Sequence, residues 1–192
     1  MLIIFAHRYR RIIQCCVYML YVVGDVWGVT YLDNIMYVVC RDSSTIRLYN
    51  TDTLSTLDVV IDVTGMTDPR DIVVCRHDRQ LYVADWYCIW RVSCDDHSYI
   101  NWLNTQFIVW SLSMTSQHLL VTSRDPPTLR QYSTMNKQLL CVVELSQYVK
   151  LLWYAVETTH GTFVIGHYGT SQDKWQCAVS ELLRFCNISI TL

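Results

Sequence analysis

The sequence predicts an all-β protein made of about four consecutive antiparallel sheets, and three observations lead to this prediction. The chain of 192 residues is 52% hydrophobic and 17% charged, a composition typical of a packed domain rather than a disordered one. Short runs rich in β-branched and aromatic residues alternate with polar turns, and the one stretch with helix-like spacing, Val179–Cys186, has strand-like flanks. Finally, a two-strand pattern recurs four times along the chain.

The recurring pattern is a β-hairpin. Each copy begins with alternating apolar residues, crosses a polar turn and returns through a run rich in apolar and β-branched residues. The copies follow one another at intervals of roughly 40 residues. They begin near Trp27, Ile72, Trp110 and Tyr154, and their polar turns contain Asp33–Asn34, Asp78–Arg79, Ser116–Gln117 and His160–Gly161.

Two further strands complete each unit. A third strand ends at Asn50, Ser93, Ser133 and Ser180, and a fourth apolar run follows most copies, at residues 56–63, 138–145 and 183–190. Four strands at this interval are typical of a β-propeller blade, so the sequence predicts about four four-stranded antiparallel blades within residues 25–192, as a partial or small propeller. Another all-β fold, such as a sandwich, also has many short strands but does not predict a matching register in four separate windows.

The first 24 residues form a separate N-terminal segment. A basic group, Arg8, Arg10 and Arg11, precedes the apolar run Ile12–Val23. A signal peptide or anchor is one interpretation, but no small-residue cleavage site follows, and the run is shorter than a membrane span of about twenty residues. Its composition favours a strand. We expect it to pair as an outer strand, either beside the last blade near residues 175–190 or at the edge of the arc of blades.

The stretch Asp68–Ser93 resembles a repeat of the NHL type of β-propeller. The resemblance rests on a proline-led first strand, a short turn and a second strand ending in "LYVAD". At the place of Asp85 the other copies have Cys40, Ser123 and His167. The chain also resembles short propeller-like proteins of invertebrate animals, which implies no known activity. The positions that match the NHL pattern are Pro69, Asp71, Ile72, Val74, Leu81, Tyr82, Val83, Ala84 and Asp85.

Structural roles account for the repeated residues. We expect Trp27, Trp110 and Tyr154 to fill the space between adjacent blades. Asp85 is predicted to accept hydrogen bonds from backbone amides in the turn after the second strand. The histidines are expected to face solvent. The alternative is a ligand face that contains Asp85 and His167, because these two residues occupy equivalent positions on different blades.

Motifs for catalysis and metal binding are missing from the sequence. Some propellers related to the NHL type are metal-dependent hydrolases or lyases, so the resemblance allows such an activity. However, the six histidines have no ligand-like spacing, and the chain contains no CxxC pair, G-x-S-x-G, H-E-x-x-H or glycine-rich phosphate loop. We therefore predict no metal, no cofactor and no enzymatic activity.

The remaining prediction is a protein-interaction module built on an NHL-like propeller. Exposed turns are expected to contact an unknown protein partner. The net charge of −2 and the scattered basic residues disfavour nucleic acid, and no segment favours a membrane. The alternative is a fragment of a longer propeller without independent activity. The predicted contact loops contain Arg76, His77, Asp78 and Arg79 in one turn, and Arg124 and Asp125 in another.

The cysteine content predicts the compartment. Nine cysteines, an odd number, lie mostly inside apolar runs. Unpaired cysteines of this kind behave as small buried hydrophobic residues. We therefore predict free thiols and a reducing, cytoplasmic location.

Overall fold

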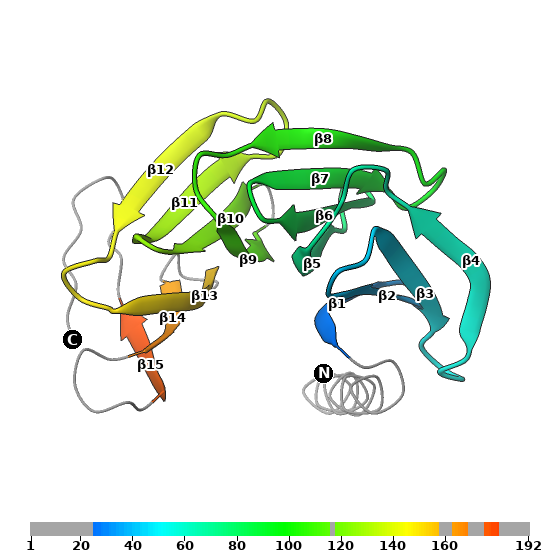
Figure 1. The fold of residues 1–192 in the computed structure, drawn as a ribbon, viewed down its shortest axis with the longest axis horizontal. Helices are drawn as coiled ribbons and strands as arrows, with labels where there is room; N and C mark the ends of the chain where they lie inside the picture. Colours follow the sequence, from blue (N-terminus) through cyan, green and yellow to red (C-terminus); the bar gives the residue numbers. More distant parts are fainter. Residues whose placement is uncertain (1–24, 116–117, 158–162, 169–174, 181–192) are drawn as a thin grey trace.

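The computed structural model describes residues 25–115, 118–157, 163–168 and 175–180. Within these ranges every helix or strand position is a strand, and fifteen strands form four separate antiparallel sheets. The sheets follow one another in an arc, with the first strand of each sheet toward the concave side (Figure 1). This arrangement confirms the predicted all-β, propeller-like fold. The run Ile12–Val23 and the fourth strand predicted at residues 183–190 lie outside the described residues.

Each sheet is one blade, and its strands are neighbours in chain order. Blade 1 contains β1 (Val26–Leu32), β2 (Ile35–Cys40), β3 (Thr45–Asn50) and β4 (Thr56–Asp62). Blade 2 contains β5 (Pro69–Cys75), β6 (Gln80–Asp85), β7 (Cys88–Ser93) and β8 (Tyr99–Asn104). Blade 3 contains β9 (Val109–Met114), β10 (His118–Arg124), β11 (Pro127–Ser133) and β12 (Leu139–Glu144). The described part of blade 4 contains β13 (Leu151–Glu157), β14 (Phe163–Tyr168) and β15 (Trp175–Ser180).

The turns explain why each hairpin closes where the sequence predicts. In blade 1, Leu32 pairs with Ile35, so Asp33 and Asn34 form a two-residue connection. Asp33 has a φ of 54°, a conformation that Asp and Asn tolerate better than most residues. All four third strands end at the predicted polar residues.

The core lies in layers between consecutive blades, because successive side chains of a strand point to opposite faces of its sheet. Leu81 belongs to the cluster between blades 1 and 2, whereas its neighbour Tyr82 belongs to the cluster between blades 2 and 3. In blade 3, Leu119 and Leu120 divide in the same way between the second and third clusters. All four side chains are at most 1% exposed. Each middle strand therefore contributes to two hydrophobic layers.

Polar contacts also join neighbouring blades. Arg79 in the turn between β5 and β6 binds Asp33 of blade 1 at 2.9 Å and Asp95 of its own blade at 2.7 Å. Between blades 3 and 4, the Ser113 hydroxyl donates to the backbone carbonyl of Ala155 at 2.6 Å. The first strands of consecutive blades also contact each other directly. These contacts confirm that the four windows form separate blades packed side by side. Among the described residues, no helix is long and apolar enough to cross a membrane.

Candidate functional site at the first strands

The first strand of every blade has a β-bulge at the same place. In blade 1, Val26 pairs with Cys40 and Gly28 with Val39, so Trp27 is left out of the pairing. The same skip occurs near the start of β5, β9 and β13. Such bulges redirect a side chain and are frequent beside binding sites. The four skipped residues, called the bulge residues below, are Trp27, Arg70, Trp110 and Trp153.

These pairings correct the sequence alignment in two of the four copies. Trp27 and Trp110 are equivalent, as predicted. Their counterpart in blade 2 is Arg70 rather than Ile72, and their counterpart in blade 4 is Trp153 rather than Tyr154. Ile72 is 3% exposed and belongs to the core between blades 1 and 2. The alignment was shifted because it held the spacing to the second strand constant. The connection between the paired residues Val74 and Leu81 is two residues longer than that between Tyr31 and Met36, and the connection between Glu157 and Phe163 is one residue longer.

The expected role of the first-strand aromatic residues is also wrong. Trp27, Trp110 and Tyr154 were expected to fill the space between blades, but all three are partly or largely exposed, Tyr154 by 40%. The Tyr154 ring lies over Gly166 of the next strand, where a Cβ atom would be 2.1 Å from the ring. The layers between blades contain mainly aliphatic side chains instead.

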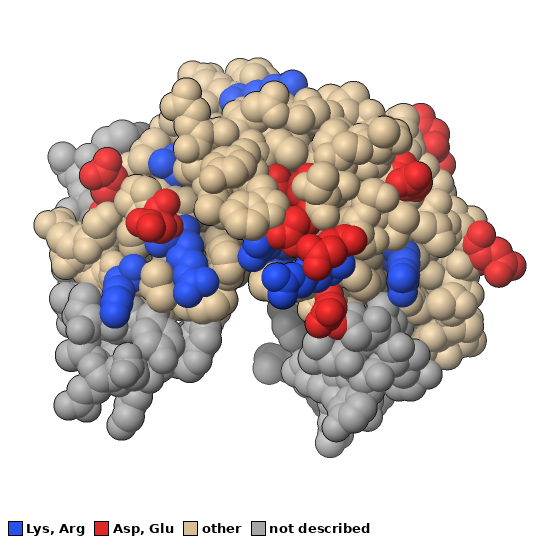
Figure 2. Space-filling model, in the orientation of Figure 1, with Lys and Arg blue, Asp and Glu red and all other residues tan. Residues whose placement is uncertain are grey.

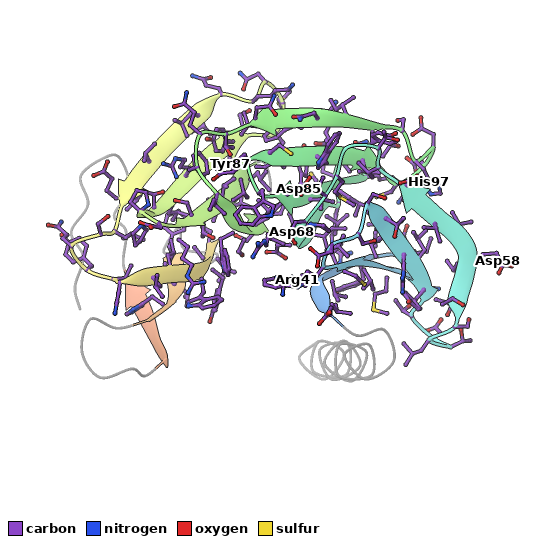
Figure 3. The ribbon with its side chains drawn as sticks, in the orientation of Figure 1. Arg41, Asp58, Asp68, Asp85, Tyr87 and His97 are labelled. Atoms are coloured by element: carbon purple, nitrogen blue, oxygen red, sulfur yellow. The ribbon has the colours of Figure 1, made fainter. Side chains whose placement is uncertain are left out.

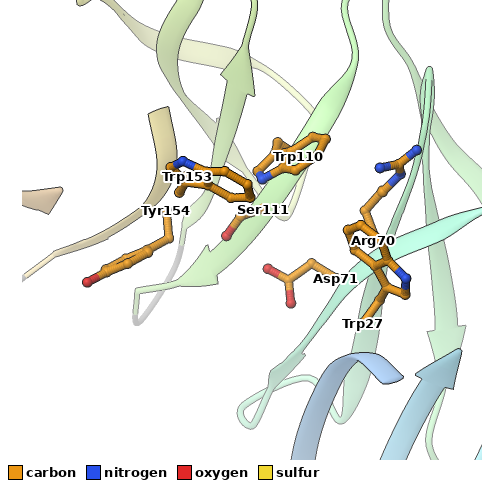
Figure 4. A pocket seen from close by; sticks show the side chains of 7 residues that line it. All are labelled: Trp27, Arg70, Asp71, Trp110, Ser111, Trp153 and Tyr154. Carbon is orange, nitrogen blue, oxygen red and sulfur yellow. The ribbon is translucent and has the colours of Figure 1, made fainter. Parts of the chain in front are cut away.

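The bulge residues surround a pocket of about 350 Å³ between the first strands (Figure 4). Its volume lies within the range of about 300–1,000 Å³ that is usual for ligand sites. All four blades contribute to the lining, which contains four aromatic rings, one basic and one acidic side chain, and a hydroxyl. The lining residues of this inner-strand pocket are Trp27, Arg70, Asp71, Trp110, Ser111, Trp153 and Tyr154.

Arginine and tryptophan side chains alternate beside the pocket. The Arg70 guanidinium carbon is 4.9 Å from the ring centroid of Trp27 and 5.1 Å from that of Trp110. Arg124 lies 4.8 Å from the Trp110 centroid and 4.5 Å from that of Trp153. The Trp27–Trp110 and Trp110–Trp153 pairs meet edge to face, with centroids 6.2 Å and 5.2 Å apart. We call these five residues the tryptophan–arginine cluster; cation–π attraction holds its guanidinium planes against the indoles.

The two arginines of the cluster differ in their charge partners. Arg70 forms a largely buried ion pair with Asp68 at 2.6 Å and also lies 4.5 Å from the Trp86 centroid. By contrast, the Arg124 guanidinium has no ion pair or hydrogen bond with any residue in the described part of the chain. Its contacts there are the two indole rings. The positive charge of Arg70 is therefore compensated locally, and that of Arg124 is not.

Asp71 connects blades 2 and 3 from the wall of the pocket. Its Oδ1 accepts the Ile72 backbone N–H at 2.8 Å, and its Oδ2 accepts the Leu112 backbone N–H at 2.8 Å. Burial raises the pKa of Asp71 to about 6, although these hydrogen bonds and one from Ser111 act in the opposite direction. The carboxyl group is thus a structural link whose charge depends on pH near neutrality.

Asp85 and His167 occupy equivalent positions, as predicted, since Asp85 pairs with Pro69 and His167 with Leu152 at the start of the neighbouring first strand. Both side chains are buried, each with 3% exposure. The expectation that His167 faces solvent is therefore wrong; its side chain is buried on β14, the middle strand of the described part of blade 4. His77 does face solvent, with 86% of its side chain exposed.

The Asp85 carboxylate is occupied by internal hydrogen bonds. It accepts the backbone N–H groups of Thr67 at 3.1 Å and Asp68 at 2.8 Å, and the indole N–H of Trp90 at 3.0 Å. Backbone amides do bind Asp85, as predicted, but they belong to the segment before β5 rather than to the turn after β6. The reason is the antiparallel pairing, which puts the end of β6 beside the start of β5.

The two predicted contact loops lie at opposite ends of the blades. The turn Arg76–Arg79 lies where the first strands end, and it binds blade 1: Arg76 donates to the Tyr31 carbonyl at 3.3 Å, and Arg79 pairs with Asp33. Arg124 is the last residue of the second strand of blade 3, at the end of the blade where the first strands begin, and joins the cluster. Its neighbour Asp125 is exposed.

The surroundings of the pocket carry charges of both signs. Figure 3 places Arg41 and Asp68 near the concave side of the arc and Asp58 at its periphery. Arg41 lies 5.8 Å from the Trp27 centroid and 3.6 Å from the Asp42 carboxylate. In the space-filling view, basic and acidic side chains lie next to each other along this side (Figure 2). Within the described ranges, no group of three or more His, Cys, Asp or Glu residues is placed to hold a metal ion.

The comparisons with known proteins identify the fold only. No family model and no curated protein matches this sequence. Three solved structures share the arrangement at low identity. The nidogen/laminin complex matches with a TM-score of 0.65 and 13% identity, over 82% of this chain and 62% of that one. The computationally designed Ika4 protein has a TM-score of 0.60 and 11% identity, over 80% and 90%. The designed Ika8 protein has a TM-score of 0.58 and 12% identity, over 80% and 45%. These similarities support a β-propeller-like arrangement of the four sheets.

Proposed function

We propose that this protein is a non-enzymatic interaction module that binds a segment of a partner protein at the inner-strand pocket. The repeated bulge carries the proposal. Four first strands place a tryptophan or an arginine at the same irregular position, and all four side chains line one pocket. A bulge weakens the sheet locally, so its recurrence with these residue types favours a role in recognition.

The residue types of the pocket are those that contribute most to protein interfaces. Trp, Tyr and Arg are enriched among residues whose truncation costs the most binding energy. Tyr154 is 40% exposed, and its partly exposed neighbours Trp153 and Trp110 lie beside it in the lining. A partner side chain inserted here would remove aromatic surface from water without a large rearrangement of the sheets.

The proposal includes no metal, cofactor or catalytic group. The carboxylate of Asp71, which lines the pocket, and that of Asp85 each accept hydrogen bonds from backbone amides of the fold. We therefore assign them structural roles. We also propose a reducing, cytoplasmic compartment, which agrees with the free thiols of Cys40, Cys75, Cys88 and Cys94.

Selection from a displayed random-peptide library on the purified full chain tests this function. Selected peptides are synthesised and titrated while the intrinsic tryptophan fluorescence is recorded. We expect Tyr154→Ala to weaken binding by about tenfold or more, as is usual for a central aromatic contact. Tyr99→Ala is the matched control, because Tyr99 lies on β8 with 36% exposure and outside the pocket. The proposal is wrong if no peptide is selected, or if the two variants bind equally well.

A further inference from the structure

We propose that the partner segment carries an Asp or Glu side chain next to an aromatic residue, and that Arg124 binds its carboxylate. This inference rests on the proposed function and adds the chemistry of the ligand. It starts from Arg124, a partly buried guanidinium with two indole contacts and no acceptor among the described residues. A carboxylate matches the planar donor edge of a guanidinium in two parallel hydrogen bonds.

The packing of Arg124 prepares it for this role. Trp110 and Trp153 contact the guanidinium at 4.8 Å and 4.5 Å, which restricts its orientation before any ligand binds. A pre-oriented guanidinium loses less conformational entropy when its hydrogen bonds form. The same two indoles line the inner-strand pocket. A carboxylate on Arg124 would therefore lie within one residue's reach of a side chain in that pocket.

The aromatic neighbour of the carboxylate follows from the lining of the pocket. Trp153 and Tyr154 come from the first strand of blade 4, and Trp110 from that of blade 3. Edge-to-face and offset contacts with these rings favour an aromatic side chain over an aliphatic one. The volume of about 350 Å³ accommodates one such ring.

A cationic ligand is disfavoured by the same geometry. Aromatic cages for ammonium groups offer free ring faces to the ligand. Here Arg70 and Arg124 already lie against the indoles of Trp27, Trp110 and Trp153. A nucleic acid would use the same aromatic and basic groups, but its phosphates would also meet the exposed carboxylates of Asp42 and Asp125. The charge balance therefore favours a single carboxylate over a polyanion.

Matched peptide pairs test the inference with the selected peptides. We expect the library selection to enrich Asp or Glu beside Phe, Tyr or Trp. Replacement of that acidic residue by Asn or Gln should weaken binding to the unmodified protein by about tenfold or more, the usual effect of a hydrogen-bonded charge. Arg124→Gln should abolish the difference between the two peptides. Arg47→Gln is the matched control, because Arg47 is exposed on the third strand of blade 1 and is not part of the pocket lining.

The outcomes separate this inference from the proposed function. Peptides that require Tyr154 but show no preference for an acidic residue, or an unchanged preference in Arg124→Gln, would overturn the inference alone. Failure to select any peptide would overturn both. A labelled single-stranded oligonucleotide serves as the competing probe at 50 mM and 200 mM salt. If it binds through Arg124 with strong salt dependence while the acidic peptides do not bind, the ligand is a nucleic acid and the inference is wrong.

Discussion

Asp85→Ala distinguishes a structural carboxylate from a ligand contact. The substitution removes the acceptor for the Thr67 and Asp68 amides and for the Trp90 indole. Thr67 is an exposed residue, so its amide can bind water instead. Asp68 and Trp90 are buried, and their N–H groups would lose their acceptor.

The expected loss of stability follows from these two donors. A buried donor without a partner costs about 1–3 kcal/mol. Two such donors therefore predict a loss of roughly 2–5 kcal/mol in the free energy of unfolding, partly offset because the burial cost of the carboxylate disappears. Domains of this kind have about 5–15 kcal/mol in total, so the loss is a large fraction of the whole.

Urea denaturation monitored by tryptophan fluorescence measures this effect. Asp58→Ala is the control, because Asp58 is exposed on β4 and its replacement should change the unfolding free energy by no more than about 0.5 kcal/mol. Asp85→Asn should show an intermediate loss, since the amide oxygen keeps one acceptor. If Asp85→Ala is no less stable than Asp58→Ala, the carboxylate does not hold the segment before β5, and a ligand role for Asp85 regains support.

Three further predictions concern the contacts between blades. Gly28→Ala should destabilise the protein by about 1–3 kcal/mol in thermal or urea unfolding, because the new Cβ would lie 2.7 Å from the Ile72 backbone nitrogen. An unchanged melting temperature would contradict the close approach of β1 and β5. Burial raises the pKa of Asp71 from 3.8 to about 6 in the folded protein. The protonated carboxyl group therefore contributes its full stabilisation to the folded state below about pH 4, and this stabilisation is lost as the pH rises to about 6. The unfolding free energy of the unmodified protein should therefore fall relative to that of Asp71→Asn across this interval, and parallel pH curves would refute the shift. Arg79→Met should lower the melting temperature slightly at low salt and less at 1 M NaCl, because the exposed pairs of Arg79 with Asp33 and Asp95 are screened; a salt-independent effect would contradict an electrostatic contribution.

The strands were predictable from the sequence because their signals are local. Polar residues close the third strands at Asn50, Ser93, Ser133 and Ser180, and these bounds are confirmed. The equivalence of Asp85 and His167 was also predictable, since both end a run with the same spacing from its first apolar residue. Burial of His167 was not, because it depends on how the faces of its sheet are packed in the tertiary structure rather than on the local pattern.

The bulge residues escaped prediction for a physical reason. The apolar pattern was matched at a constant spacing between the first and second strands, but the connection between them is longer in blades 2 and 4 than in blade 1. Ile72 and Tyr154 are as apolar as Trp27, so the pattern aligned them with it and passed over Arg70 and Trp153. Only the pairing with the second strand restores the correct register. A search for Trp or Arg close to the start of every first strand, with its register fixed from the second strand, is the signal that finds them.

The repeated bulge separates residues that are constrained by the stability of the fold from residues that are free to change with the ligand. Residues inside the ladder must satisfy their partners on the adjacent strand and in the layers between blades, so their replacement is tied to the stability of the whole arc. A bulge residue is excluded from that pairing, as Trp27 is between Val26 and Gly28. Three blades carry Trp at this position and one carries Arg, on the same backbone irregularity. The scaffold can therefore acquire a new specificity through single-residue changes at these four positions, without any revision of its fold.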